Sequence, residues 1–299
     1  MTPCAAGFHT HIPPEELAGE PEAPAVPAGL EVVDAHVHLF PPGIFHALWR
    51  WFDQYGWNVR YRLQAEEVVA FLKARGVSRF CALHYAHKPG LARVLNPFVT
   101  EIARAHPEVI PLGTVMPGEP DAAEIVREAF RGGARGIKLH CHVQRMGADD
   151  PRLDEIYAAC ADAGMPVLIH AGREPNLAGY GLDTHALCGA DQVDRALARH
   201  PRLTMVVPHL GADEFVAYGA LLDRHERLYL DTTMVVADYF GQAPPEDLFP
   251  ARAERLLYGT DFPNIPYAWS RELGKILERK LPPEKQHALL AGNALALFG

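Results

Sequence analysis

Hydrophobic and polar positions follow one repeating pattern along most of the chain after residue 29. Short, nearly continuous apolar runs alternate with stretches in which apolar residues recur every three or four positions. The runs are typical of strands covered by helices, and the spaced positions are typical of amphipathic helices. The predicted strands are residues 30–38, 77–85, 108–117, 134–142, 165–172, 202–211, 227–233 and 254–263. The predicted helices are residues 63–76, 91–107, 121–133, 151–164, 189–201, 212–226, 266–281 and 283–298, with a poor, proline-broken helix at 243–253.

Eight strand-then-helix units indicate an α/β architecture with a parallel sheet. They occupy roughly 270 residues, which fits a (β/α)₈ TIM barrel of typically ~250 residues. A doubly wound open sheet is the alternative, but it usually has a glycine-rich loop after its first strand, and "DAHVHLFPP" contains no glycine. We therefore predict a TIM barrel over residues 30–299. Residues 1–29 form an N-terminal arm, because segment 12–29 is rich in Pro, Ala, Glu and Gly.

Composition narrows the classes of function. Hydrophobic residues make up 48% of the 299 positions and the net charge is -9, without a basic block that would indicate nucleic-acid binding. No apolar run approaches the ~20 residues that span a bilayer, and the first residues do not form a secretory signal. The five cysteines are scattered and lack a CxxC motif, which favours reduced thiols in a cytoplasmic protein. We expect a small-molecule substrate, no nucleic acid and no membrane.

Polar residues end seven of the eight predicted strands. In a TIM barrel the chemistry lies at these carboxyl ends, where the strands converge on one small volume. A single histidine after an apolar run is more often structural, but so many imidazoles and carboxylates in one volume need a compensating charge. A divalent metal supplies it, and Zn, Fe, Ni or Mn suit these ligands. The strand-end residues are His36, His38, His84, Lys138, His140, His170, His209, Asp231 and Asp261.

Two HxH pairs compete for the role of metal ligand. Alternate residues of a strand face the same way, so His36 and His38 can both point into the barrel mouth. His9 and His11 follow "MTPCAAGF", which is not a convincing strand. We predict that His36 and His38 bind the metal and that the first pair is incidental, with a lid over the site as its alternative role.

Five motifs carry a resemblance to a known family. "DAHVH", "HAG", "HLG", "GTDFP" and the terminal "AGNALALFG" resemble the amidohydrolase superfamily. Within it, the chain is similar to the branch of TIM-barrel metal-dependent hydrolases that includes aminocarboxymuconate-semialdehyde decarboxylase. The resemblance runs from about residue 31 to residue 299, and its specificity comes from the motifs occurring together and in order.

The resemblance implies a ligand set and a catalytic pair. His36, His38, His170 and Asp261 match the metal ligands, and Asp261 also handles protons. His209 matches the histidine that orients or polarises water or substrate. We expect one divalent metal per chain, with Zn favoured. A second metal requires Lys138 to be carboxylated and to bridge the two ions.

Four residues are candidates for substrate binding, each with a structural alternative. Lys138 contacts an anionic substrate, bridges two metals or forms a structural ion pair. His140 is a pocket residue or a packed imidazole. Arg173 binds a substrate carboxylate through a bidentate fork or forms a loop ion pair. Asn264 follows Asp261 closely enough to face the substrate.

The segment 39–62 after the first strand is long and contains eight aromatic residues. It either forms a wall over the pocket, which would favour a planar or aromatic substrate, or is a helix that packs its aromatic residues on the barrel or on a second subunit of a homodimer.

These residues predict a metal-dependent enzyme without fixing its reaction. Asp261 as base and His209 beside it can hydrolyse an amide, lactone or related acyl bond of a small carboxylate-bearing substrate. The same set supports non-oxidative decarboxylation of a small aromatic or unsaturated acid, or addition of water to a double bond. A barrel that binds without turnover is the remaining alternative, and the intact set of polar residues argues against it.

Overall fold

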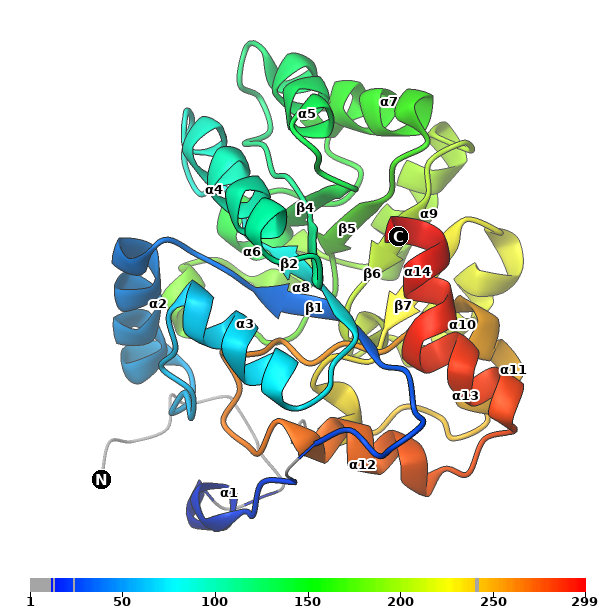
Figure 1. The fold of residues 1–299 in the computed structure, drawn as a ribbon. Coiled ribbons are helices and arrows are strands. Elements are labelled where there is room, and N and C mark those ends of the chain that lie inside the picture. Colours follow the sequence, from blue (N-terminus) through cyan, green and yellow to red (C-terminus); the bar gives the residue numbers. More distant parts are fainter. Residues whose placement is uncertain (1–11, 13, 24, 240–241) are drawn as a thin grey trace.

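The computed structural model of the chain describes residues 12, 14–23, 25–239 and 242–299 (Figure 1). His9 and His11 lie outside these residues. The strands lie in the middle of the molecule and helices surround them (Figure 1). The strands are β1 Val33–His38, β2 Arg79–Leu83, β3 Val109–Pro111, β4 Ile137–His140, β5 Val167–His170, β6 Met205–Val207, β7 Leu228–Asp231 and β8 Leu256–Leu257.

All neighbouring strands pair in parallel and in chain order, β1 to β3 in one sheet and β4 to β8 in another. Parallel bridges join the two sheets at both seams, between Gly113 and Ile137 and between Val37 and Phe262. Hydrogen bonds reinforce the seams, from Lys138 N to Gly113 O at 2.7 Å and from His38 N to Phe262 O at 2.7 Å. The eight strands therefore form a closed ring.

Side chains alternate between the interior of the ring and the layer beneath the helices. Inward apolar residues include Cys81, Ile110 and Leu168, and the C-terminal Phe298 packs with them. Strand β4 places Ile137 and Leu139 in the outer core, so the residues between and after them face inward. This alternation puts Lys138 and His140 inside the barrel, at the carboxyl end of the strand.

Strand β1 departs from simple alternation. Val33 and Ala35 belong to the interior core, whereas Val37 belongs to the outer core. The pairing with β2 shifts register between Asp34 and Val37, which accompanies this change of face. His36 and His38 consequently both line the interior cavity.

Helices connect the strands and cover the ring. The helix α3 begins with a capping box between Gln64 and Glu67, and α7 ends at Gly164, whose φ of 65° suits glycine. The α-helices are α1 Pro14–Gly19, α2 Pro42–Tyr55, α3 Ala65–Ala74, α4 Ala92–Ala105, α5 Ala122–Arg131, α6 Cys141–Gln144, α7 Asp154–Ala163, α8 Thr184–Leu187, α9 Ala190–Arg199, α10 Phe215–Arg224, α11 Leu248–Arg252, α12 Ser270–Glu278, α13 Pro283–His287 and α14 Asn293–Phe298. Shorter turns are η1 Pro151–Leu153, η2 Ala178–Tyr180, η3 His209–Gly211, η4 Val235–Ala237, η5 Ala253–Arg255 and the π-turn η6 Ala288–Gly292.

Three regions differ from the expected elements. Two short helices, α6 and α8, lie in stretches where none was predicted, whereas α2 in segment 39–62 is the helix that was one of the two alternatives there. The expected strand 254–263 is regular only at Leu256–Leu257, because the chain beyond turns at Asp261, whose φ is 65°. A pattern of apolar residues alone does not show where a strand bends out of its ladder.

The described part of the arm packs on the barrel. Leu17 is buried, and Arg60 donates to the carbonyl oxygens of Leu17 and Glu20 at 3.0 and 2.8 Å. Glu20 pairs with Arg271 of α12 at 2.6 Å. Figure 1 shows α1 beside this edge of the molecule, away from the strands.

Two further predictions concerned membrane-spanning segments and the state of the cysteines. Of the described helices, none is long and apolar enough to cross a membrane. Cys81, Cys141, Cys160 and Cys188 are buried free thiols.

Candidate active site

A cavity of about 320 Å³ opens at the carboxyl ends of the strands. Its floor is polar, and its lining includes most of the predicted strand-end residues: His36, His38, Lys138, His140, His170, His209 and Asp261. These residues lie at or near the carboxyl ends of their strands, and the closed ring brings those ends together.

Three of these residues form what we call the polar corner: His36, His38 and Asp261. The Asp261 carboxylate lies 2.8 Å from His38 Nε2 and 3.6 Å from His36 Nε2. Both histidines are buried and the Asp261 side chain is 15% exposed, so this carboxylate is the member that faces the open cavity. One ligand atom from each residue lies within 4.8 Å of the others, a spacing that can hold a metal ion.

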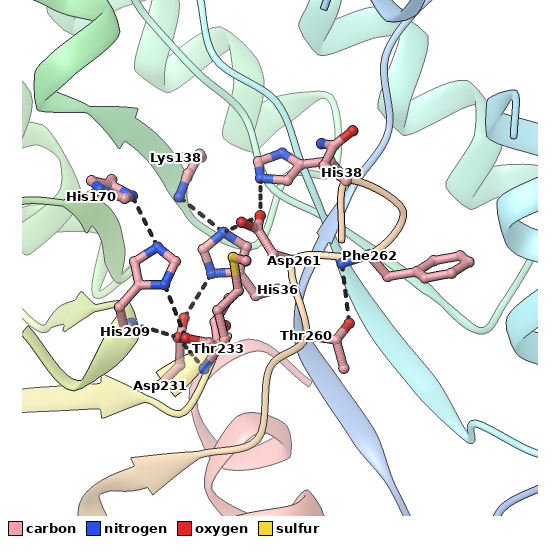
Figure 2. A network of polar contacts seen from close by, with 12 residues as sticks. His36, His38, Lys138, His170, His209, Asp231, Thr233, Thr260, Asp261 and Phe262 are labelled. Carbon is pink, nitrogen blue, oxygen red and sulfur yellow. Dashed lines mark hydrogen bonds and ion pairs between the residues drawn. The ribbon is translucent and has the colours of Figure 1, made fainter. Parts of the chain in front are cut away.

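Asp231, at the end of β7, fixes the ring of His36. Its Oδ2 lies 2.8 Å from His36 Nδ1, and its Oδ1 accepts from the backbone N–H groups of His209 and Thr233 (Figure 2). Burial and the charge of Lys138 lower the pKa of His36 to about 4, so the ring is neutral. A neutral ring that donates from Nδ1 has its electron pair on Nε2, the atom that lies 3.6 Å from the Asp261 carboxylate.

Asp261 is held in an unusual backbone conformation. Its φ of 65° is rare for a residue other than glycine, and its N–H donates to the carbonyl of His36 at 2.9 Å. Burial acts to raise the pKa of Asp261, but the hydrogen bond and charge of His38 hold this pKa well below its usual range. The carboxylate is therefore ionised in the corner.

A buried carboxyl joins the two strands that carry the corner. Asp34 Oδ2 accepts from the Thr260 hydroxyl at 2.6 Å, while its Oδ1 accepts from His36 N at 3.0 Å. Burial raises the pKa of Asp34 to about 7 despite these bonds. Sequence reasoning missed Asp34 as a positioning residue, although its place in "DAHVH" was the available signal.

His170 and His209 form a second group next to the corner. His170 Nδ1 lies 3.2 Å from His209 Nε2, and His209 Nδ1 donates to the Thr233 carbonyl at 2.9 Å (Figure 2). Burial lowers the pKa of both histidines. His209, like Asp261, has a positive φ, here 59°. The structure brings His170 into the same cavity but not into the group of three donors around Asp261.

The remaining floor residues are Lys138 and two imidazoles. Lys138 is fully buried, and its Nζ lies 3.3 Å from His36 Nε2. Burial lowers the pKa of Lys138 to about 8, against the opposing charges of Asp261 and Asp231. His140 stacks on His170 with ring centroids 4.2 Å apart, so it both lines the pocket and packs on another imidazole.

The two other predicted substrate-binding residues have different surroundings. Asn264 is buried in the cavity lining, and its Oδ1 has no hydrogen-bond partner among the described residues. Arg173 does not line the cavity. Its guanidinium lies 3.0 Å from Glu214 and 3.9 Å from Asp213. Of the two predicted alternatives for Arg173, the structure therefore has the loop ion pair. Arg145, which sequence reasoning did not consider, lines the cavity instead.

One side of the cavity is an apolar wall, formed by Phe40, Ile44, Ala47, Leu48, Trp51, Phe52 and Trp57. Most of these residues belong to α2, whose Phe45 and Trp49 pack into the core on the other side. Trp51 also contacts Tyr180 of η2, with ring centroids 5.0 Å apart. The aromatic segment therefore does both things that were predicted for it, since one face packs and another lines the pocket.

Comparison with known families identifies the family of the chain. Residues 33–299 match the model of the family described as Amidohydrolase. The chain belongs to the amidohydrolase family. The predicted resemblance is confirmed, and the protein is an enzyme of this family. No curated protein matches it.

Solved structures of other amidohydrolases and relatives confirm the TIM-barrel fold. An uncharacterised TIM-barrel protein from Bordetella bronchiseptica has 23% identity and a TM-score of 0.70, covering 90% of this chain and 98% of that chain. A 5-carboxyvanillate decarboxylase from Sphingomonas paucimobilis has 18% identity and a TM-score of 0.64, covering 90% and 99%. A probable 2-pyrone-4,6-dicarboxylic acid hydrolase from Acinetobacter baumannii, with citric acid bound, has 14% identity and a TM-score of 0.60, covering 90% and 100%.

The polar corner of this amidohydrolase fits a divalent metal. His36 has the tautomer of a metal ligand, because its Nδ1–H donates to the Asp231 carboxylate and the proton stays on that nitrogen. Imidazole and carboxylate donors suit Zn, Mn or Fe. The ionised Asp261 adds the negative charge that a buried cation needs.

Proposed function

We propose that this amidohydrolase is a metal-dependent hydrolase, which cleaves an amide, lactone or related acyl bond of a small carboxylate-bearing substrate. The observation that carries the proposal is the polar corner, where one ionised carboxylate faces two imidazoles and an open cavity. His36, His38 and Asp261, with His170 beside them, would hold one divalent metal, and Zn is the ion we favour.

Each residue of the site then has a separate role in hydrolysis. A divalent metal supplies Lewis acidity, which lowers the pKa of water toward ~7. Asp261 accepts the proton of that water and returns it to the leaving group. His209 donates from Nδ1 to the Thr233 carbonyl, so its Nε2 carries the electron pair. This nitrogen lies 3.2 Å from His170 Nδ1 and would accept a hydrogen bond from the attacking water once His170 turns its own nitrogen to the metal. Lys138 stabilises negative charge that develops on the substrate.

Decarboxylation is the second candidate, and the apolar wall favours it. A cavity side of aromatic rings suits a small aromatic acid, and one of the similar structures is a 5-carboxyvanillate decarboxylase. The same corner would bind the acid, and Asp261 or His209 would pass a proton taken up from water to the carbon from which CO₂ departs.

The first test measures metal. We expect about one divalent ion per chain in protein purified without chelator, by plasma mass spectrometry. His36→Ala should lose this ion, whereas His106→Ala should retain it, because His106 pairs with Glu66 on the surface. A wild-type chain that takes up no Zn or Mn would overturn the proposal.

The second test separates the two reactions. Metal-loaded enzyme is screened on carboxylated lactones, amides and aromatic acids in water enriched in ¹⁸O. A hydrolase produces a new carboxylate that contains solvent oxygen, whereas a decarboxylase releases CO₂ and takes up a proton at carbon. CO₂ release without incorporation of solvent oxygen would replace hydrolysis by the second candidate.

A further inference from the structure

We propose that Arg145 binds a carboxylate at the outer end of the substrate and thereby determines specificity. The inference rests on the proposed function, because it names the part of the substrate that the polar corner does not hold. It also assigns to Arg145 the anion-binding role for which Arg173 was the sequence candidate.

The backbone directs Arg145 toward the cavity. The residue follows the short helix α6, which itself begins directly after His140 at the end of β4. Its φ of 56° is in the left-handed region, which turns the chain sharply at this point. Arg145 lines the cavity but is exposed, whereas His140 and His142 of the same segment are buried. The guanidinium therefore lies toward solvent, outside the polar floor.

No carboxylate of the described residues neutralises the positive charge of Arg145. Its Nη1 and Nη2 donate to the carbonyl oxygens of Tyr180 and Gly181 at 3.4 and 3.2 Å, which are long bonds to uncharged acceptors. No described carboxylate lies within ion-pair distance of this guanidinium. Asp261 is the one carboxylate among the described lining residues, and His38 holds it in the corner.

Arg173, on the neighbouring loop, is by contrast an arginine already held in an ion pair. It lies 3.0 Å from Glu214 and outside the cavity lining. A guanidinium has five N–H donors in a planar fork, and a carboxylate fits that fork with two parallel bonds. Arg145 retains this capacity, and Arg173 has already used much of it on an acidic side chain.

Aromatic side chains lie between the two ends. The ring of Tyr180 contacts His142 at 5.0 Å and Trp51 at 5.0 Å, measured between centroids. The carbonyl of the same Tyr180 accepts from Arg145. A substrate that reaches from the corner to Arg145 therefore passes along the apolar wall. The geometry selects a planar or apolar body with the reacting group at one end and a carboxylate at the other.

Binding of substrate-sized probes tests this arrangement without turnover. Terephthalate and biphenyl-4,4′-dicarboxylate are each compared with their monoamides by isothermal titration calorimetry on zinc-loaded full-length protein. Charged hydrogen bonds predict that wild type binds at least one dicarboxylate roughly ten-fold or more tightly than its monoamide. Arg145→Met should abolish this preference, and Arg145→Lys should retain part of it, since a lysine keeps the charge without the fork.

Arg173→Met is the matched control, because it removes an arginine of the neighbouring loop that is already paired. It should retain the preference. The inference is overturned if neither wild-type pair shows a preference, if the preference survives Arg145→Met, or if Arg173→Met abolishes it. The metal content of the same samples after zinc treatment separates this result from the proposed function. Protein that takes up no zinc but still distinguishes the probes through Arg145 contradicts the hydrolase proposal and leaves the inference intact.

Discussion

The polar floor of the cavity lies at the strand ends, whereas its apolar wall lies on α2 and on the residues that flank this helix. Backbone ladders hold the floor, and a buried chain of hydrogen bonds from Lys138 through His36 to Asp231 fixes its side chains (Figure 2). The wall is held by ring contacts such as that between Trp51 and Tyr180. The groups whose chemistry needs fixed distances therefore lie at the ends of the barrel strands, and the groups that recognise the shape of the substrate lie on the segments that connect strands to helices.

The first prediction removes a residue that supports the polar floor without lining the cavity. Asp231→Asn removes the carboxylate that holds the proton on His36 Nδ1 and should weaken zinc affinity about 10- to 100-fold, the usual effect of such partners. Competition with a chromophoric chelator measures the affinity. Calorimetry with aromatic probes should show that the wall is unaffected in the folded variant. An unchanged zinc affinity would mean that Asp231 does not orient a metal ligand.

The second prediction removes part of the apolar wall and leaves the polar floor unchanged. Trp51→Ala removes a ring that lines the cavity and contacts Tyr180, so aromatic ligands should bind roughly ten-fold more weakly, as expected for the loss of an aromatic pair and its buried area. Metal content should stay the same. Arg50→Ala, at an exposed position of the same helix, is the control and should change neither quantity. Loss of metal in Trp51→Ala would show that floor and wall are not separable.

The third prediction concerns a region outside both. Glu20→Gln weakens the ion pair between the arm and Arg271, in which both side chains are 18% exposed. A partly exposed pair of this kind contributes about 0.5–1 kcal/mol, so the free energy of unfolding in urea should fall by no more than that. Zinc affinity and probe binding should not change. A loss of either would show that the arm supports the cavity.

The chain's pattern of residues predicted the barrel and the polar floor because both depend on local order. Eight apolar runs at regular spacing need a covered parallel sheet, and the polar residues at the ends of seven of these runs lie at the mouth wherever that sheet closes. His36, His38, Lys138, His209 and Asp261 all line the cavity for this reason. Asn264 follows Asp261 into the same lining because the chain turns there.

What the tertiary structure decided involves residues far apart in sequence. The contact of Asp231 with His36 spans 195 positions, and that of Thr260 with Asp34 spans 226, so no periodicity could pair them. The exchange of Arg173 for Arg145 has the same cause. Which arginine faces the cavity depends on a left-handed turn after α6 and on where Glu214 lies, and only the folded chain sets these two positions. By itself, the sequence determined the fold and the kinds of side chain on the floor, because these follow from spacing along one strand at a time. The tertiary structure decided which groups orient the ligands and which charge remains unpaired, because those depend on contacts between segments.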